Sequence, residues 1–329
     1  MFVPNVQVCA IIVTYHPDPS FPARLEKVGR QVGRVLIVDN SGNNRAIAFL
    51  KGHAHKDDVE VIYNSRNLGV AAALNLGAAR ARDLGFAWAL TLDQDSEPSE
   101  DMVRCLWSVL QGDPRPETLA ILAPQIIEAS LGRPARFLRA GRAVLFDRPL
   151  CDGGRTMEVT TAITSGSLLG LRAHSDFGGF REDFFMDYVD TEYCLRAQTR
   201  GYRILAVCSA KLYHRLGDRK EISLGPLRLY PTFYGPDRWY TLSRNRIPMV
   251  RRYGLRFPHW LLYEVLASAF ITARMLLAEP QRRAKVKAIL RGTWDGLLGR
   301  MGPPDAFAES PAGISEDRGH ADSGDPLDL

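Results

Sequence analysis

The sequence predicts an α/β protein in which helices flank a sheet of short buried strands. Three observations point to this class: apolar runs recur early in the chain, polar or turn residues end each run, and helix-forming segments separate the runs. Continuous apolar runs are typical of strands that are buried on both faces. The chain has 329 residues and 46% hydrophobic content, which is enough to bury a large core.

The expected strands follow one another in the first third of the chain, with apolar runs at residues 8–13, 35–38, 59–63 and 86–92. A helix is expected at 70–84, where an alanine-rich stretch stops at Gly85. Because ligands of such sheets bind outside the carboxyl ends of the strands, the polar residues that follow the runs should meet in one crevice. These residues are Tyr15, Asp39, Asn67 and Asp93.

Each of these residues also has an ordinary structural interpretation. Asp39 could cap the next helix, and Asn67-Leu68-Gly69 could be a simple turn. Together they suit a nucleotide, since a ribose and base need a carboxylate and an amide, and phosphates need a cation or a helix N-terminus. The helix near Gly69 would supply such a terminus. No Gly-x-Gly-x-x-Gly motif follows the first run, which argues against a dinucleotide cofactor.

Two carboxylates, Asp93 and Asp95, lie one residue apart where the fourth apolar run ends. Such a pair can hold a hard divalent cation and, through it, a diphosphate, because Mg²⁺ takes oxygen ligands from one or two carboxylates plus phosphate. The alternative is a turn that leads to a helix cap at Ser99. The residues upstream favour the metal site.

Five segments in the first two thirds of the chain form a joint pattern: Ile11-Ile12-Val13-Thr14-Tyr15, Ile37-Val38-Asp39-Asn40, Asn67-Leu68-Gly69, Asp93-Gln94-Asp95 and the segment Asp187 to Arg196. In this order they resemble the family 2 glycosyltransferases of GT-A fold, and within them the bacterial rhamnosyltransferases, over about residues 6–250. The resemblance implies a mixed sheet flanked by helices, a nucleotide-sugar donor and a Mg²⁺ or Mn²⁺ cofactor.

The resemblance also implies roles for single residues. Asp39 would recognise the base, near the Thr14-Tyr15 backbone, while Asn67 and Gly69 would line the nucleotide pocket. Asp93 would face the ribose and the metal, and Asp95 would bind the cation that bridges the two phosphates of the donor.

Asp190 aligns with the general base of the family. The usual Glu-Asp pair is Val189-Asp190 here, so only the second acid is present. Residues 189–200 read as a helix with Asp190 in its first turn, where the helix dipole favours a carboxylate. Asp190 could therefore be a mere surface acid. The apolar segment Phe184-Phe185-Met186 before it would desolvate the carboxylate and raise its pKa towards useful basicity.

His214 follows a strand-like run at residues 203–208 and could be structural, although the resemblance implies contact with the metal or the diphosphate. Imidazole suits Mn²⁺ better than Mg²⁺. Arg244 and Asn245 follow Trp239-Tyr240 and are expected to contact the phosphates or the acceptor. A basic surface loop is the alternative.

The chain changes character after the expected catalytic domain, residues 1–254. A helical appendage is expected at 255–301, and a disordered acidic tail at 302–329. Residues 260–278 are almost wholly apolar but contain Glu264 and Arg274, so we expect an amphipathic helix that lies on a bilayer or packs on the catalytic domain. The basic cluster after it could bind anionic headgroups: Arg282, Arg283, Lys285, Lys287 and Arg291.

Charge and cysteine content suggest the cellular setting. The net charge is +5, which suits an anionic donor and acidic lipids, while no motif supports nucleic-acid binding. Five cysteines without paired spacing favour reduced thiols. No N-terminal targeting segment is apparent, because the first strand starts almost at once. We therefore expect a cytoplasmic protein, either free or peripheral on the inner face of the cytoplasmic membrane.

The expected function is that of an inverting, metal-dependent glycosyltransferase in cell-surface polysaccharide synthesis such as that of lipopolysaccharide. The resemblance implies transfer of L-rhamnose from dTDP-β-L-rhamnose to a saccharide acceptor attached to a lipid. A nucleotidyltransferase is one alternative, but it would carry a glycine-rich basic loop where this chain has Thr14-Tyr15-His16-Pro17. A non-catalytic saccharide-binding or scaffold protein of the same fold is the other.

Overall fold

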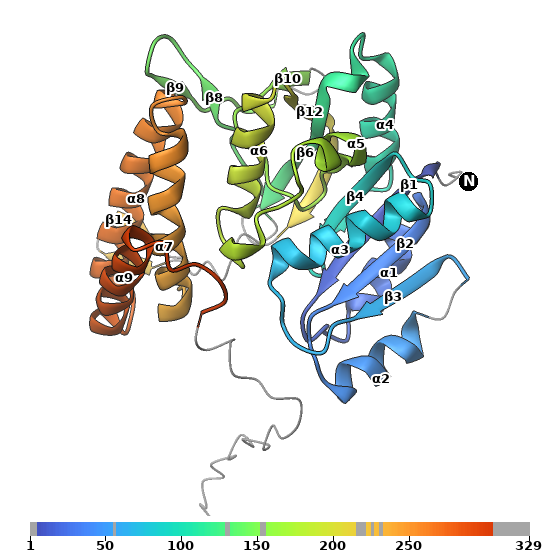
Figure 1. Cartoon of the computed structure of the whole chain (residues 1–329), viewed down its shortest axis with the longest axis horizontal. Helices are drawn as coiled ribbons and strands as arrows, with labels where there is room; N and C mark the ends of the chain where they lie inside the picture. Colours follow the sequence, from blue (N-terminus) through green and yellow to red (C-terminus); the bar gives the residue numbers. More distant parts are fainter. Residues whose placement is uncertain are drawn as a thin grey trace, which may run out of the picture.

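The computed structural model shows a mixed β-sheet covered by helices on both faces (Figure 1). It describes residues 5–54, 57–128, 132–151, 156–214, 222–224, 227–229 and 233–304. The expected acidic tail therefore lies outside the described residues from position 305 onward.

The central sheet has the strand order β10-β12-β6-β11-β4-β1-β2-β3, with β5 beside β12 and β7 beside β6. Its strands are β1 (Asn5–Thr14), β2 (Val32–Asp39), β3 (Val59–Tyr63), β4 (Trp88–Asp93), β5 (Glu97–Pro98), β6 (Leu119–Glu128), β7 (Arg133–Pro134), β10 (Thr156–Glu158), β11 (Leu168–Gly170) and β12 (Arg203–His214). β4, β1, β2 and β3 are parallel, as are β6 and β12, whereas β11 is antiparallel to both β4 and β6. β8 (Arg139–Ala140) pairs with β9 (Phe146–Asp147), and β13 (Ile222–Leu224) pairs with β14 (Leu227–Leu229).

The helices are α1 (Phe21–Gly29), α2 (Asn44–His53), α3 (Val70–Asp83), α4 (Met102–Gly112), α5 (Leu171–Asp176), α6 (Val189–Thr199), α7 (Pro236–Tyr253), α8 (Pro258–Ala278) and α9 (Arg282–Leu297). Short 3₁₀ turns occur at η1 (Pro116–Thr118) and η2 (Glu182–Phe184). In Figure 1 the helices α7, α8 and α9 stand together at the left, and the parallel strands β1 to β3 lie at the right.

Two apolar cores fill the two faces of the sheet, because the side chains of a strand alternate between its faces. In β1, Cys9 and Ile11 pack with α3 and α6, whereas Val8, Ala10 and Ile12 pack with α1 and α4. Nearly all of these strand residues are fully buried. Burial on both faces explains why the strands read as unbroken apolar runs.

The four expected strands and the 70–84 helix are confirmed, as β1 to β4 and α3. Their bounds differ from the expected ones by a few residues, which is the usual uncertainty at element ends. The expected appendage contains α8 and α9. However, α9 packs closely on α7, since a Cβ at Gly292 or Gly296 would overlap the backbone of Tyr240 or Arg244.

The expectation of five reduced cysteines is wrong. Cys151 and Cys208 form a disulfide across 57 residues of sequence, while Cys9, Cys105 and Cys194 are free thiols. No local pattern marks this pair, because its partners come together only when the segment before β10 folds against β12. The disulfide fixes that segment to the sheet.

Candidate active site

The polar residues at the ends of β1, β2 and β4 meet at one edge of the sheet, as expected. Thr14 is paired with Asp39, and Val13 with Asp93, in the parallel register of the sheet. Thr14 donates a hydrogen bond from its hydroxyl to Asp39 Oδ1 at 2.8 Å, and Ser41 donates another at 2.7 Å. The other oxygen, Oδ2, is buried and has no partner among the described residues. Since buried polar atoms are normally satisfied, this oxygen suits an N–H donor of a ligand.

Gln94 lies between Asp93, the last residue of β4, and Asp95, and its side chain bonds to the end of β1. Its side chain accepts a hydrogen bond from the Tyr15 backbone N–H at 2.8 Å and donates one to the Tyr15 carbonyl at 3.1 Å. This double link ties the ends of β1 and β4 together. It also leaves the side chains of Asp93 and Asp95 directed to the other side of the turn, and Tyr15 itself is exposed.

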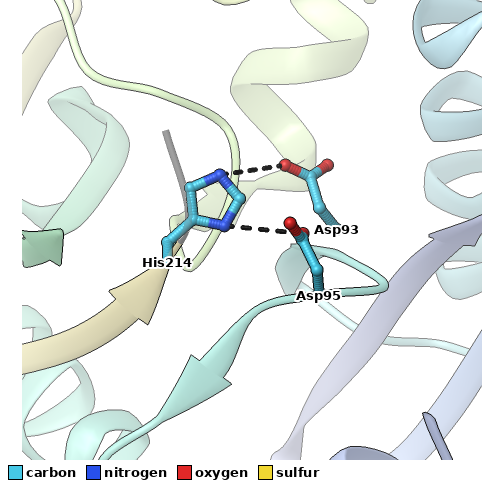
Figure 2. Close-up of side chains that lie close together, drawn as sticks. All are labelled: Asp93, Asp95 and His214. Atoms are coloured by element: carbon cyan, nitrogen blue, oxygen red, sulfur yellow. Dashed lines mark ion pairs between the residues drawn. The ribbon is translucent and has the colours of Figure 1, made fainter. Parts of the chain in front are cut away.

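Asp93, Asp95 and His214 form a cluster whose potential ligand atoms all lie within 4.8 Å of one another. His214 comes from the end of β12, and Figure 2 shows its ring facing the two carboxylates, with one ring nitrogen directed to each. Nε2 lies 3.7 Å from Asp93 Oδ2, and Nδ1 lies 3.6 Å from Asp95 Oδ1. Residues more than 100 positions apart in the sequence therefore face one small volume.

Two serines fix this cluster from behind. Ser165 accepts a hydrogen bond from the Asp93 backbone N–H at 3.1 Å, and its hydroxyl lies 2.5 Å from that of Ser96. Ser96 in turn lies 3.1 Å from His214 Nδ1. Ser165 belongs to the hydroxyl-rich segment at 161–167, which was the only signal for it in the sequence.

The chemistry of the cluster fits a divalent cation. Two carboxylates and one imidazole match Mn²⁺, or Mg²⁺ with the carboxylates as principal ligands. Burial raises the pKa of Asp93, the nearby His214 lowers it, and Asp95 raises it further. A bound dication would hold both acids in their charged form.

Asp190 lies in the first turn of α6, as expected, and its Oδ1 accepts a hydrogen bond from the Thr191 backbone N–H at 2.7 Å. Burial raises the pKa of Asp190 to about 6, which the hydrogen bond from Thr191 opposes and the charges of Asp187 and Asp93 favour. The carboxylate is therefore ionised at neutral pH, yet more basic than a free aspartate, as a general base should be. The charge of Asp93 is one of the causes that raise the pKa of Asp190, so the two carboxylates influence each other electrostatically.

The loop before Asp190 is strained. Phe185, Asp187 and Tyr188 adopt positive φ angles of 64°, 58° and 62°, which L-residues rarely do. Surrounding contacts must hold such a conformation in place. Gly69 is one of them, because its Cβ-free backbone lies against Phe185 and the Val70 N–H donates to the Phe185 carbonyl at 2.9 Å.

Arg244 and Asn245 hold this loop rather than lining the crevice. Asn245 Nδ2 donates to the carbonyls of Phe184, Met186 and Asp187 at 3.0, 2.8 and 3.1 Å. Arg244 Nη2 donates to the Phe184 carbonyl at 3.2 Å. Both side chains are buried, at 1% and 0% exposure, so the structure gives them a structural role beneath the site.

Asn67 occupies the edge of the sheet but is used locally. Its Oδ1 accepts a hydrogen bond from the Gly69 N–H at 2.9 Å, which shapes the start of α3. Asn40, which sequence reasoning did not single out, donates to the Gly69 carbonyl at 3.0 Å. The turn interpretation of Asn67-Leu68-Gly69 therefore describes this segment, and a contact with the nucleotide stays a prediction.

Two further contacts connect the loop with α7. Asp187 accepts hydrogen bonds from Arg238 Nε at 3.1 Å and from Thr241 Oγ1 at 2.7 Å. Arg238 is partly exposed, and its guanidinium stacks on Tyr234 at 4.1 Å from the ring centroid. Its positive charge lowers the pKa of Asp93. Sequence reasoning missed Arg238, since nothing local distinguished it from the other cations of its segment.

The fold is that of glycosyltransferases of GT-A architecture. Residues 9–126 match the Glycosyl transferase family 2 model, which together with the relatives below supports a glycosyltransferase. The resemblance seen in the sequence is thus confirmed, and neither a nucleotidyltransferase nor a non-catalytic protein is retained.

The relatives agree with this assignment. The chain is 25% identical to the dTDP-rhamnosyl transferase RfbF of Shigella flexneri over 301 residues. The aligned part covers 91% of this chain and 98% of that protein. The chain also shares its fold with GalNAc-T7 solved with UDP, GalNAc and Mn²⁺, at a TM-score of 0.54 and 14% identity over 76% of this chain. The chain spans about half of that second protein, 49% of its length.

Proposed function

We propose that the protein transfers L-rhamnose from dTDP-β-L-rhamnose to a saccharide acceptor on a lipid carrier, with inversion at the anomeric carbon. The observation that supports this most is the cluster of Asp93, Asp95 and His214 at the end of β4, together with a buried Asp190 whose pKa is raised in part by the charge of Asp93. The similarity to dTDP-rhamnosyl transferase RfbF over nearly its whole length supports the choice of donor.

The chemistry needs one group on each side of the reacting carbon. Asp190 accepts the proton of the acceptor hydroxyl as its oxygen forms a bond to the anomeric carbon, and the bond from that carbon to the donor phosphate oxygen breaks. Asp93, Asp95 and His214 would hold the divalent cation, which neutralises the charge that develops on the departing dTDP. Asp39 Oδ2, which is buried without a partner among the described residues, would accept a hydrogen bond from the N–H of the thymine base.

A donor screen tests the proposal. The protein is mixed with dTDP-L-rhamnose, dTDP-glucose, UDP-GlcNAc or GDP-mannose in Mn²⁺ or Mg²⁺, and the melting temperature is recorded. Ligands that bind the folded state raise it by mass action, so dTDP-L-rhamnose should give the largest shift. Release of dTDP from the same donor should follow in a coupled assay. A larger shift and faster turnover with a UDP-sugar would replace the proposed donor.

Membrane contact through α8 and α9 is the second part of the proposal. α8 is long and apolar enough to cross a membrane, with 21 residues and a mean hydropathy of 1.6 over its most apolar window. Only 11% of that window is buried inside the protein. The polar side of α8 faces the catalytic domain, since Glu264 is 9% exposed, whereas Val265, Leu266 and Phe270 are 53–61% exposed. This arrangement suits a helix that lies on a bilayer at the cytoplasmic face.

α9 continues that surface with exposed Leu290 and Trp294, and with cations nearby. Arg282, Arg283 and Lys287 are exposed, which suits anionic headgroups. Lys285 does not share this role, because it is 2% exposed and forms an ion pair with Glu279 at 2.7 Å. Hereafter the docking surface denotes Val265, Leu266, Phe270, Leu290 and Trp294.

A further inference from the structure

A cleft of about 230 Å³ opens beside Asp190, on the side of the base that faces α8. Its walls include Asp190 and Thr191 of α6, Arg136 and Arg148 of the segment around β8 and β9, and Tyr263 of α8, and the end of β6 and residues 161–163 complete them. None of Asp93, Asp95 and His214 is among the lining residues. The cleft therefore adjoins the base without containing the metal cluster.

The two arginines are held in place by a hairpin at residues 136–149. Arg136 Nη1 donates to the Arg148 carbonyl at 2.7 Å, and Arg148 Nη2 donates to the Arg136 carbonyl at 3.2 Å. The base of the hairpin is fixed as well, because Gln125 donates to the Ala135 carbonyl at 2.8 Å and Cys151 is bonded to Cys208. The guanidinium groups are thus positioned before any ligand arrives.

Most of their hydrogen-bonding capacity is unused. A guanidinium carries five N–H donors, and within the described residues each of the two shows one hydrogen bond, to a backbone carbonyl. Arg148 Nε is buried and has no partner among the described residues. Neither arginine has a carboxylate within ion-pair distance in the part of the chain that the structure describes, whereas Arg139 of the same hairpin pairs with Asp147 at 2.6 Å.

Tyr263 connects this cationic pair with the helix of the docking surface. The Arg148 guanidinium lies 4.9 Å from the centroid of its ring, and Phe146 meets the same ring edge-on at 5.4 Å. Tyr263 directly precedes Glu264, and Val265 and Leu266 follow on the exposed side of α8. The cleft therefore adjoins the apolar surface that we assign to the bilayer.

We propose that Arg136 and Arg148 bind a phosphate or diphosphate ester of the acceptor, so that the enzyme acts on a sugar close to its phosphorylated lipid. This inference rests on the proposed glycosyl transfer and identifies the acceptor class. Planar guanidinium groups bind phosphate through two parallel hydrogen bonds, and two unpaired cations in one cleft need an anion. The diphosphate of the donor belongs at the metal cluster, which leaves the acceptor as the source of the anion.

Binding of simple probes tests this site directly. Farnesyl diphosphate, inorganic pyrophosphate and farnesol are titrated calorimetrically into the full-length protein in saturating dTDP and EDTA, so that neither the nucleotide pocket nor a metal can recruit the probe. Farnesyl diphosphate should bind, and farnesol should not. Weaker binding of pyrophosphate assigns the site to prenyl-linked phosphate, whereas equal binding assigns it to the phosphate group alone.

Variants show whether the arginines form the site. Arg136→Gln and Arg148→Gln should each weaken farnesyl diphosphate by about tenfold to a hundredfold, the effect of losing a charge-assisted hydrogen bond. The control Arg142→Gln, an exposed arginine at the tip of the same hairpin, should bind like the wild type. Arg136 is exposed, so its variant stays informative even where Arg148→Gln unfolds.

The two proposals fail separately. Wild-type binding by both variants, or equal binding of farnesol and farnesyl diphosphate, would overturn the acceptor site alone. The donor assay on the wild-type protein is independent of these arginines. Absence of dTDP release from dTDP-L-rhamnose would reject the proposed donor while leaving the anion site standing.

Discussion

Glu264, the only acid in α8, accepts a hydrogen bond from the hydroxyl of Tyr188, two residues before the proposed base Asp190. Arg246 of α7 donates to the same carboxylate at 3.0 Å, and Ser268 donates at 2.8 Å. Tyr188 occupies one of the strained positions of the loop, with φ of 62°. Helix α8 and the loop before Asp190 are therefore joined through the buried carboxylate of Glu264.

Loss of the Glu264 carboxylate should displace Asp190 without removing a group that contacts the substrates. We expect Glu264→Leu to lower kcat by about tenfold and to destabilise the protein by about 1–3 kcal/mol, because Arg246 and Tyr188 lose a buried acceptor. Glu264→Gln should recover part of kcat, since an amide still accepts a hydrogen bond. The KM for the donor should stay within about twofold, and Thr272→Val, on the same side of α8, serves as the control. A higher KM for the donor together with an unchanged kcat would contradict the positioning role.

Removal of the base should separate chemistry from binding. Asp190→Asn should lower kcat by about 10²-fold to 10⁴-fold, the range for a general base, and leave the Kd of the donor unchanged. Asp83→Asn, an exposed acid on α3, should behave like the wild type. Steady-state kinetics with calorimetry of donor binding measures both quantities. Full turnover by the Asn variant would remove Asp190 from the mechanism.

The same residue predicts the pH dependence. Its pKa is raised to about 6, and the base acts only in its ionised form, so kcat/KM should rise with pH through about 6 and level off above it. Stability should move the other way. A folded-state pKa above the unfolded value means that ionisation opposes folding, so wild-type stability falls as pH rises from about 4 to 6. Above pH 6 the Tm of Asp190→Asn should equal or exceed that of the wild type.

Metal dependence should follow the cluster at the end of β4. EDTA should abolish transfer, and Mn²⁺ should restore it. Asp95→Ala and His214→Gln should remove the metal-dependent part of donor binding, because each takes away one ligand of the cluster. Glu100→Gln, an exposed acid a few residues away, is the matched control. Metal-stimulated donor binding that survives in Asp95→Ala would place the cation elsewhere.

Membrane binding should depend on the docking surface. Co-sedimentation with vesicles should be strong for anionic lipids and weaker for neutral ones, and high salt should reduce it. Phe270→Ser and Trp294→Ser, at positions that are 61% exposed in each case, should reduce binding further. Val6→Ser alters an exposed apolar residue of β1, which lies at the other end of the molecule in Figure 1. Equal losses for Val6→Ser and Phe270→Ser would show that the surface is not specific.

The disulfide gives a simple chemical prediction. Under denaturing, non-reducing conditions the protein should titrate three thiols, because Cys151 and Cys208 are bonded. Cys151→Ser should lower the free energy of unfolding by about 2–4 kcal/mol. Cys105→Ser, at a partly buried free thiol, is the control. Five titratable thiols in the purified protein would contradict the bond.

The strands and several site residues could be predicted because their signals are local. The apolar run before Asp93-Gln94-Asp95 predicts both a strand and the acids at its end. Parallel strands bring such ends together along one edge of the sheet. Arg244 and Asn245 had an equally clear local pattern, which predicted contact with the phosphates or the acceptor, but their side chains are buried beneath the site. Their polar groups satisfy the carbonyls of a strained loop some 60 residues earlier in the sequence, which no local pattern can show.

The sequence by itself determined the α/β class, the carboxylates at the sheet edge and the position of Asp190 in a first helical turn, because periodicity and capping act over a few residues. Only the tertiary structure decided which side of α8 faces the protein, that Glu264 holds the loop before Asp190, and that Arg136 and Arg148 share a cleft with Asp190. These relationships join residues from separate elements, so they depend on how the helices and the hairpin pack rather than on the order of residues within any one of them.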